Sequence, residues 1–287
     1  MQPLENRCLS AFIRGSNSLS RMNEPVRILS DLHLGHMVSR IVRVAALRPL
    51  IAGAGTVVFN GDTWQELAAP LRERSAAMLE ELRQLCTEEG ADAVFLSGNH
   101  DPGWAGPGWI GLAGGRIIVT HGDALCGESS PWKREILMSR ERVRELWKQH
   151  PAADHDVGER LAIARAIART MCSQEYPRGR HLIQRAWDAA VPPQRALKML
   201  AAWYMQSVLG ARFCDRYFPQ AEVLVIGHFH RHGCWVKNGR LIINTGSFVS
   251  PGRAHWVEWH AGWLTCCEID EAPDRCCRGR TRGVWRL

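Results

Sequence analysis

The stretch Ser97-Gly98-Asn99-His100-Asp101 decides the fold, because it joins a strand end to side chains with metal and proton chemistry. It follows the apolar run Ala93-Val94-Phe95-Leu96, which is typical of a buried strand. Glycine lets the backbone turn sharply off that strand. The turn then presents an amide oxygen that can bind a metal, an imidazole that carries protons near neutral pH, and a carboxylate that can orient the imidazole.

Four other apolar, β-branched runs end in the same way. Asp31-Leu32-His33 follows 26–29, Gly61-Asp62 follows 56–60, His121-Gly122-Asp123 follows 117–120, and Gly227-His228-Phe229-His230 follows 223–226. The carboxyl ends of strands are where sites assemble in α/β folds. A single loop histidine or helix-capping aspartate has an ordinary structural explanation. Five such endings in one chain predict a metal site.

The candidate ligands are seven nitrogen and oxygen donors: Asp31, His33, Asp62, Asn99, His121, His228 and His230. They are too many for one tetrahedral zinc and suit two divalent ions, with manganese first and iron, zinc or cobalt as alternatives. Dications ~3.5–4 Å apart need a carboxylate between them, and Asp62 is the candidate. His100 is then free to donate a proton to the substrate. Asp101 either fixes its tautomer or is a plain turn residue.

Composition limits the class of protein. The chain has 287 residues, which suits one large domain or a domain with an insertion. Its net charge of +7 favours an anionic partner, which includes a phosphate ester, nucleic acid or an acidic membrane surface. The chain contains no run of about 18 apolar residues, so no membrane-spanning helix is predicted. The ten cysteines form no CxxC pair, so we expect reduced thiols in a cytoplasmic protein.

Periodicity predicts the elements around these loops. Residues 1–24 are expected to be a loose extension, and 271–287 a basic, poorly ordered tail. Helices are predicted over 37–47 and 71–86, a loop over 102–115, and hairpins over 234–244 and 255–269. Residues 128–220 have a helical period, with helices near 133–149, 156–172, 180–190 and 194–209.

The 128–220 segment is predicted to be a helical cap inserted between His121 and His228, so both of its ends must reach the site. It holds 16 Lys and Arg against 10 Asp and Glu, and therefore +6 of the total charge. One interpretation is a solvated bundle whose arginines face water. The other is a lid whose basic face and apolar stripe bind an anionic, partly apolar substrate.

These motifs, in this order and spacing, resemble the calcineurin-like metallophosphoesterases over residues 25–250. The resemblance implies an α/β fold, a four-layer α/β/β/α sandwich of two mixed sheets, here in a domain over 25–270 with the inserted cap. It implies that His100 assists catalysis. It also implies two metals, the first held by Asp31, His33, Asp62 and His230, and the second by Asp62, Asn99, His121 and His228.

The long insert and the ending Gly227-His228-Phe229-His230-Arg231 are similar to the UDP-2,3-diacylglucosamine pyrophosphatases of lipid A synthesis, which hydrolyse a nucleotide-sugar lipid at the membrane surface. The chain departs from that group at three places. His100 stands where the group usually has arginine, 128–132 replace an Asp-x-x-Tyr stretch, and the acid after Asp62 is displaced to Glu66.

We therefore expect a dinuclear phosphoesterase that hydrolyses a phosphate ester or pyrophosphate by attack of a metal-bridging hydroxide. The narrower expectation is a UDP-2,3-diacylglucosamine-like lipid, with the cap touching the inner membrane face. One alternative is a phosphodiesterase or nuclease acting on nucleotides or nucleic acid, which would place aromatic rings beside arginines along a groove. Another is a non-catalytic scaffold, which is expected to have lost ligands.

Overall fold

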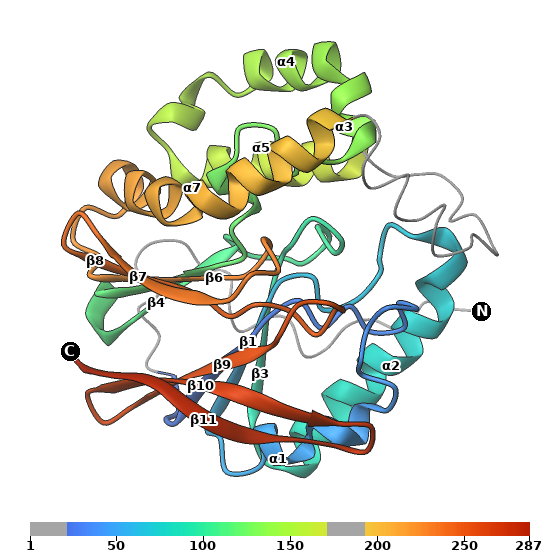
Figure 1. The fold of residues 1–287 in the computed structure, drawn as a ribbon, viewed down its shortest axis with the longest axis vertical. Helices are drawn as coiled ribbons and strands as arrows, with labels where there is room; N and C mark the ends of the chain where they lie inside the picture. Colours follow the sequence, from blue (N-terminus) through green and yellow to red (C-terminus); the bar gives the residue numbers. More distant parts are fainter. Residues whose placement is uncertain (1–21, 171–192) are drawn as a thin grey trace, which may run out of the picture.

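Two β-sheets form the centre of the protein in the computed structural model, which describes residues 22–170 and 193–287 (Figure 1). The first sheet has the order β11-β10-β9-β1-β2-β3. Strands β1, β2 and β3 are parallel, and the others extend the sheet in antiparallel fashion. Its strands are β1 (Val26–Leu29), β2 (Thr56–Asn60), β3 (Asp92–Leu96), β9 (His255–His260), β10 (Trp263–Ala272) and β11 (Arg275–Arg286).

The second sheet has the order β4-β5-β6-β8-β7. Its three central strands are parallel, and one antiparallel strand closes each edge. Both sheets are therefore mixed, as predicted. The strands are β4 (Trp109–Leu112), β5 (Ile117–Thr120), β6 (Val223–Ile226), β7 (Gly233–Lys237) and β8 (Arg240–Asn244).

Helices cover the outer face of each sheet (Figure 1). Beside the first sheet lie α1 (Arg48–Ile51) and α2 (Ala69–Glu88), preceded by the 3-10 turn η1 (Val44–Leu47). Over the second sheet lie the helices inserted between β5 and β6, which we call the cap. They are α3 (Arg134–Met138), α4 (Arg140–Gln149), α5 (Val157–Thr170) and α7 (Pro193–Tyr217), with η4 (Pro151–Asp154) between α4 and α5. Two further 3-10 turns flank β5, η2 (Ala113–Gly115) and η3 (Asp123–Leu125).

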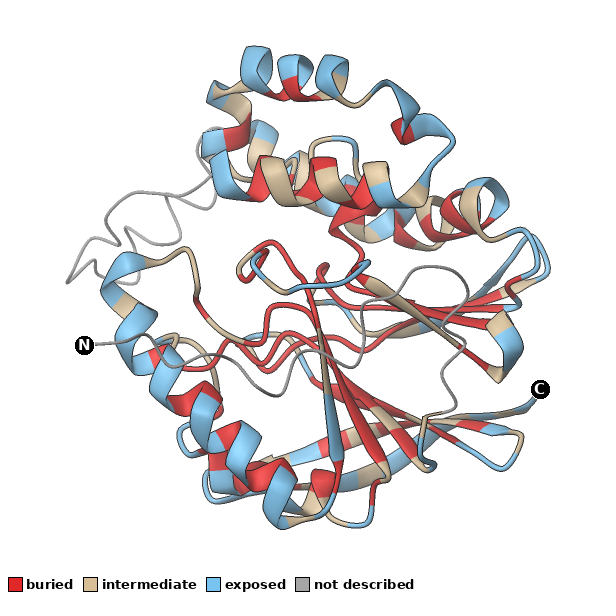
Figure 2. Ribbon diagram, turned by 180° about the vertical axis from the view of Figure 1, so that it is seen from behind, coloured by how far each residue is buried: buried red, intermediate tan, exposed pale blue. Residues whose placement is uncertain are grey.

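The central strands of both sheets are largely buried (Figure 2), and their alternating side chains divide the core into layers. On β2, Val57 and Phe59 pack with α2, whereas Val58 packs between the two sheets. On β6, Val225 points between the sheets and Leu224 packs with the cap. Because successive side chains of a strand point to opposite faces, one buried strand contributes to two cores. The result is the predicted α/β/β/α sandwich.

Two predicted elements are wrong. Residues 37–47 are largely irregular, because Ser39 bridges to Val249 and the Arg40 amide donates to the Phe248 carbonyl. The tail is not a loose segment, since β11 pairs along its length with β10. Its arginines face solvent, while Trp285 packs against the core between the sheets. A basic composition is thus compatible with an edge strand.

The remaining predictions mostly hold. Helix α2 and both hairpins occur where expected, and the cap helices match three of the four predicted helical segments. The fourth, near 180–190, lies outside the described residues, as does nearly all of the 1–24 extension. The predicted loop 102–115 contains the short strand β4. In the described part of the chain, no helix has both the length and the apolar content for a membrane span.

Candidate metal centre

The seven candidate ligands lie in loops at the carboxyl ends of five parallel strands, β1, β2, β3, β5 and β6. Backbone hydrogen bonds join these loops directly. The Asp31 amide donates to the Gly61 carbonyl at 3.1 Å, and the Gly227 amide donates to the His121 carbonyl at 2.9 Å. Contacts between the sheets bring the two edges together, since His121 Nδ1 lies 3.0 Å from the Asn60 carbonyl oxygen and the His228 amide donates to Asp31 Oδ2 at 3.0 Å. The ends of both sheets thus form one cluster, at the edge where α/β sheets place their sites.

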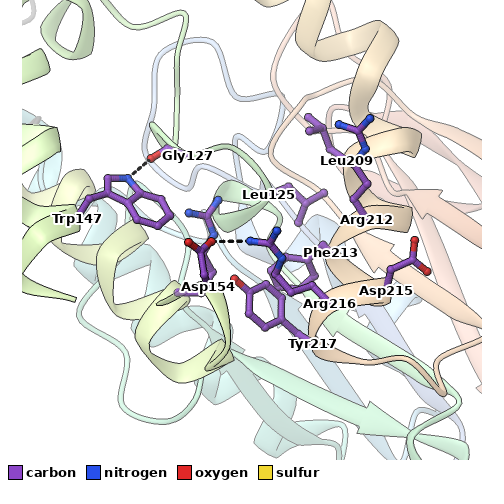
Figure 3. A pocket seen from close by; sticks show the side chains of 11 residues that line it. Leu125, Gly127, Trp147, Asp154, Leu209, Arg212, Phe213, Asp215, Arg216 and Tyr217 are labelled. Carbon is purple, nitrogen blue, oxygen red and sulfur yellow. Dashed lines mark hydrogen bonds and ion pairs between the residues drawn. The ribbon is translucent and has the colours of Figure 1, made fainter. Parts of the chain in front are cut away.

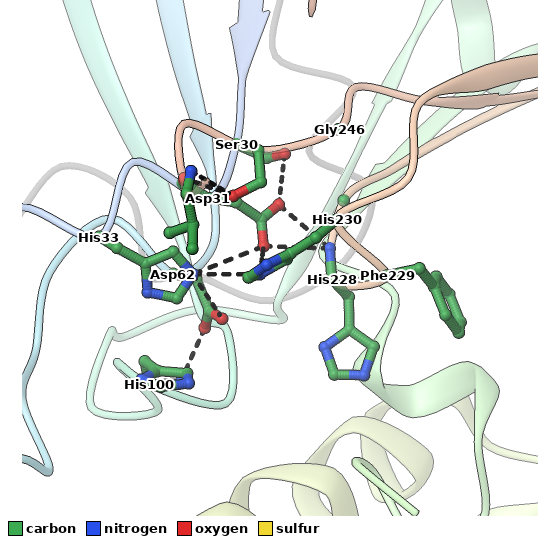
Figure 4. Close-up of polar contacts among 12 residues, drawn as sticks. Ser30, Asp31, His33, Asp62, His100, His228, Phe229, His230 and Gly246 are labelled. Atoms are coloured by element: carbon green, nitrogen blue, oxygen red, sulfur yellow. Dashed lines mark hydrogen bonds and ion pairs between the residues drawn. The ribbon is translucent and has the colours of Figure 1, made fainter. Parts of the chain in front are cut away.

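A first group of ligands is already close enough to share one ion (Figure 4). One donor atom from each of Asp31, His33, Asp62 and His230 lies within 4.8 Å of the others. His230 Nε2 is 3.1 Å from Asp31 Oδ1 and 3.2 Å from His33 Nε2, and three of the four residues are buried. The resemblance implied this same set for the first metal.

A second group presents buried lone pairs. Among the described residues, Asn99 Oδ1, His121 Nε2 and His228 Nδ1 are buried and have no hydrogen-bond partner. The other nitrogen of each imidazole donates to a carbonyl, from His121 Nδ1 to Asn60 and from His228 Nε2 to Ser129, both at 3.0 Å. Such bonds fix the tautomer and leave the second nitrogen free to bind a metal. These orphaned donors fit a second divalent cation.

Asp62 stands between the two groups. Its Oδ2 is 3.6 Å from His33 Nε2, and its Oδ1 is 3.5 Å from His121 Nε2. Oδ1 also accepts a hydrogen bond from the His100 amide at 2.8 Å. One carboxylate therefore faces both sets of imidazoles, which is the geometry that a bridging ligand requires.

The ligand loops are conformationally strained. Asp31, His33, Asp62, His228 and His230 all have positive φ angles, between 47° and 64°. L-residues other than glycine rarely adopt this region, and each such residue costs of order 1–3 kcal/mol. Strain of this kind collects at functional sites, where the surrounding structure enforces it.

Two glycines allow the loops to approach the carboxylates. A Cβ atom at Gly227 would lie 2.1 Å from Asp31 Oδ2, and one at Gly98 would lie 2.4 Å from Asp62 Oδ1. No side chain fits at either distance. The glycines of the Gly-Asn-His-Asp and Gly-His-x-His motifs therefore make room for the acidic ligands.

The electrostatics of the site favour added positive charge. Burial lowers the pKa of His33 and of His228 to about 3, so both are neutral near pH 7, the form that binds a metal. Burial opposes ionisation of Asp62, but His121 and His100 outweigh it and hold its pKa well below the usual range. Burial also opposes charging of His121, yet Asp62 raises the pKa of His121 well above its ordinary value. A cation is thus stabilised here.

Two contacts of His100 were not found from the sequence. Its Nδ1 lies 2.9 Å from Gln65 Oε1, while Gln65 Nε2 lies 2.8 Å from His33 Nδ1. Lys133 of the cap places its Nζ 3.1 Å from His100 Nε2. Gln65 stands in a stretch that departs from the pyrophosphatase pattern, and Lys133 directly follows another, 128–132; these departures were the available indication. Neither has the spacing of a motif.

Asp101 was expected either to fix the tautomer of His100 or to be a plain turn residue, and its carboxylate contacts backbone amides and an indole instead of His100. Asp101 is fully buried and accepts four hydrogen bonds. Oδ1 receives the amides of Asp62 and Gly98, both at 2.9 Å, and Oδ2 receives the Thr63 amide at 2.8 Å and Trp104 Nε1 at 3.1 Å. Asp101 therefore ties the loop after β2 to the loop after β3.

Comparison with known proteins gives one curated relative. No family model matches the chain. The chain is 29% identical over 233 residues to a UDP-2,3-diacylglucosamine hydrolase of Ralstonia nicotianae, with 74% of this chain and 78% of the relative covered. The relative's name contains the same lipid as the name of the group that the motifs resemble, and it agrees with the expectation of a hydrolase.

Solved structures also align along most of the chain. A dimetal phosphatase from Danio rerio does so at 12% identity and a TM-score of 0.44, covering 89% of this chain and 99% of that one. Zinc-bound Vps29 from Entamoeba histolytica does so at 17% identity and a TM-score of 0.39, covering 88% and 97%. The motifs, the two mixed sheets with their ligand loops, and the curated relative together identify the chain as similar to the calcineurin-like metallophosphoesterases.

Proposed function

We propose that the protein is a phosphohydrolase that works with two divalent cations. The first would be held by Asp31, His33, Asp62 and His230, and the second by Asp62 with Asn99, His121 and His228. The single observation that carries the proposal is the position of Asp62, whose two oxygens face both sets of imidazoles at 3.5 and 3.6 Å. Manganese is the first candidate for both sites, by the preference of mixed N and O ligands.

Two divalent ions in such a site lower the pKa of bound water and neutralise charge on phosphoryl oxygens. The chain itself supplies further positive and proton-donating groups beside them. His100 and Lys133 meet at 3.1 Å next to the Asp62 loop. Among the described residues Lys133 forms no ion pair, so its charge is available to a phosphoryl oxygen. Burial, with the charge of Lys133, holds the pKa of His100 well below its ordinary value, so its neutral imidazole would donate a hydrogen bond to that oxygen or to the leaving group.

Gln65 would set the protonation of two imidazoles at once. A 180° rotation of its amide places the oxygen on His33 Nδ1 and the nitrogen on His100 Nδ1, across the same 2.8 and 2.9 Å contacts. The Nδ1–H of His33 then donates to the oxygen, which frees Nε2 as a ligand. His100 Nδ1 accepts from the nitrogen and its Nε2 carries the proton, so the Lys133 ammonium, which can only donate, would have to turn from Nε2 toward a phosphoryl oxygen. This orientation suits a ligand and a proton donor together.

The proposed substrate is a UDP-2,3-diacylglucosamine-like lipid with a pyrophosphate bond. Two observations support it. The curated relative is named for this lipid. The cap also brings Lys133 to His100 and Trp132 to the candidate ligand His228, with the Trp132 ring 5.1 Å from that of His228. A cap that covers the phosphate site can also contact the apolar part of a substrate. The active domain would then be 25–270, with the cap as its lid.

The proposal is tested by metal analysis and a substrate panel. Asp62→Asn should lower the metal content of the purified protein and abolish hydrolysis of bis-p-nitrophenyl phosphate. Asp274→Asn, at an exposed turn outside the site, is the matched control and should retain both. A fully active Asp62→Asn protein would remove the bridging role. For the substrate, UDP-2,3-diacylglucosamine should be cleaved far faster than UDP-glucose, and equal rates would overturn the lipid proposal.

A further inference from the structure

The cap contains a cavity that the metal centre does not use (Figure 3). Its volume is about 500 Å³, and none of the candidate metal ligands lines it. It lies among η3, α4, η4, α5 and the second half of α7. The residues that matter to the argument are three arginines, Arg160, Arg212 and Arg216, and three rings, Trp147, Phe213 and Tyr217.

The charge of the cavity is not balanced by its own acids. Asp154 is paired with Arg216 at 2.5 Å, and Asp215 is paired with Arg240. Within the described residues, the side chains of Arg160 and Arg212 form no ion pair and no hydrogen bond. Two guanidinium groups therefore remain without an anion at the cavity wall.

Of the two arginines, Arg160 is the stronger evidence for an anion site, because its side chain is buried. Only 8% of its surface is exposed. Its guanidinium lies 4.7 Å from the centre of the Trp147 ring, and this contact offsets part of the cost of burying the charge. A ring face accepts none of the five N–H groups in the way that an oxygen does. The guanidinium nitrogens are not among the described buried atoms that lack a hydrogen-bond partner, so they keep contact with solvent in the cavity, where an oxyanion could accept from them.

Apart from the arginines and the two ion-paired acids, the wall is apolar, because the polar atoms of its rings already have partners. Tyr217 donates its hydroxyl to the Ala153 carbonyl at 2.5 Å, and Trp147 Nε1 donates to the Gly127 carbonyl at 2.9 Å. The ring surfaces themselves, together with Leu125, face the cavity. A ligand that fits must therefore place an apolar group, and best a flat one, beside its charged end.

We propose that the cap cavity is a second ligand site, which binds a small organic oxyanion through Arg160 and Arg212 and holds an aromatic or other flat group against Trp147 and Phe213. The ligand class is an aryl phosphate or aryl carboxylate. This inference does not depend on the proposed phosphohydrolase function, because no residue of the cavity belongs to the metal centre.

The test is calorimetric titration of the metal-loaded, full-length protein with phenylphosphonate, which resists hydrolysis. Wild-type protein should show one site in addition to any at the metal centre. Arg160→Met keeps the packing on Trp147 but removes the charge, and should weaken that site at least tenfold. Arg144→Met is the matched control, since Arg144 is exposed on α4 and does not line the cavity; it should leave binding unchanged.

Further arms define the ligand. Methylphosphonate should bind more weakly than phenylphosphonate at this site, because it lacks the ring; equal affinity would overturn the flat-group part. Comparison of benzoate with phenylphosphonate shows whether the site prefers a carboxylate or a phosphonate group. Binding of either compound at the second site supports the proposal. If Arg160→Met fails to fold, Arg212→Gln at an exposed position replaces it. A wild-type protein with no second site, or a second site that both variants leave intact, would overturn the proposal.

Discussion

Replacement of Asp101 by asparagine should destabilise the protein strongly, although it changes one atom. The carboxylate accepts four buried N–H groups, two at each oxygen. An asparagine side chain offers one oxygen, so its NH₂ group must face two of these donors. Burial and the neighbouring Asp62 raise the pKa of Asp101 to about 8, but all four of its partners are N–H donors, an arrangement that only the ionised carboxylate satisfies. Hydrogen bonds to a charged buried group contribute about 1.5–3 kcal/mol each, so the loss of two predicts a decrease of about 3–6 kcal/mol in the free energy of unfolding.

The assay is urea unfolding of Asp101→Asn followed by circular dichroism, with Asp274→Asn at an exposed turn as the control. Because Asp101 ties the loop of Asp62 to that of Asn99, the variant should also bind less metal. A decrease in stability below about 1 kcal/mol, the size of one ordinary hydrogen bond, would refute the reasoning. It would mean that the backbone amides find other acceptors when the loops relax.

Three other predictions follow from single contacts. Gly227→Ala places a Cβ atom 2.1 Å from Asp31 Oδ2, so the variant should fold but lose metal and activity, as measured by metal analysis. Lys133→Met should lower turnover by about 10²-fold, the usual effect of removing one charge-stabilising donor, and metal content should stay constant; loss of metal would assign Lys133 a structural role. Burial lowers the pKa of His255 to about 4, below its ordinary value of 6.5, so the unfolded state binds more protons between these values and stability should fall as pH falls through this window. His255→Gln should flatten that dependence in urea titrations, and equal slopes would contradict it.

The positions of the ligands could be predicted from sequence because topology determines them. Parallel strands bring their carboxyl ends to one edge, so His or Asp after each apolar run must converge once the strands pair. The prediction needed no knowledge of side-chain packing. Asp31, His33, Asp62 and His230 are therefore found within one coordination sphere.

The supporting residues could not be predicted in this way. Gln65 and Lys133 reach His100 from the loop after β2 and from the cap, and only tertiary packing brings those segments together. Asp101 was expected either to fix the tautomer of His100 or to be a turn residue, but its oxygens accept from Asp62 and Thr63 on another loop as well as from Gly98 and Trp104 on its own. The basic tail was expected to be poorly ordered because of its composition. The charge of the segment does not indicate that it pairs with β10 as strand β11.

The connection between the cap and His228 has a consequence for the exchange of ions. The Ser129 carbonyl that holds His228 Nε2 lies on the segment leading from His121 into the cap. Any hinge motion that lifts this segment breaks the bond, and the imidazole ring is then free to turn. If the cap moves as a lid, an ion on that side would be held less firmly while the cap is open, so metal retention would depend on cap position.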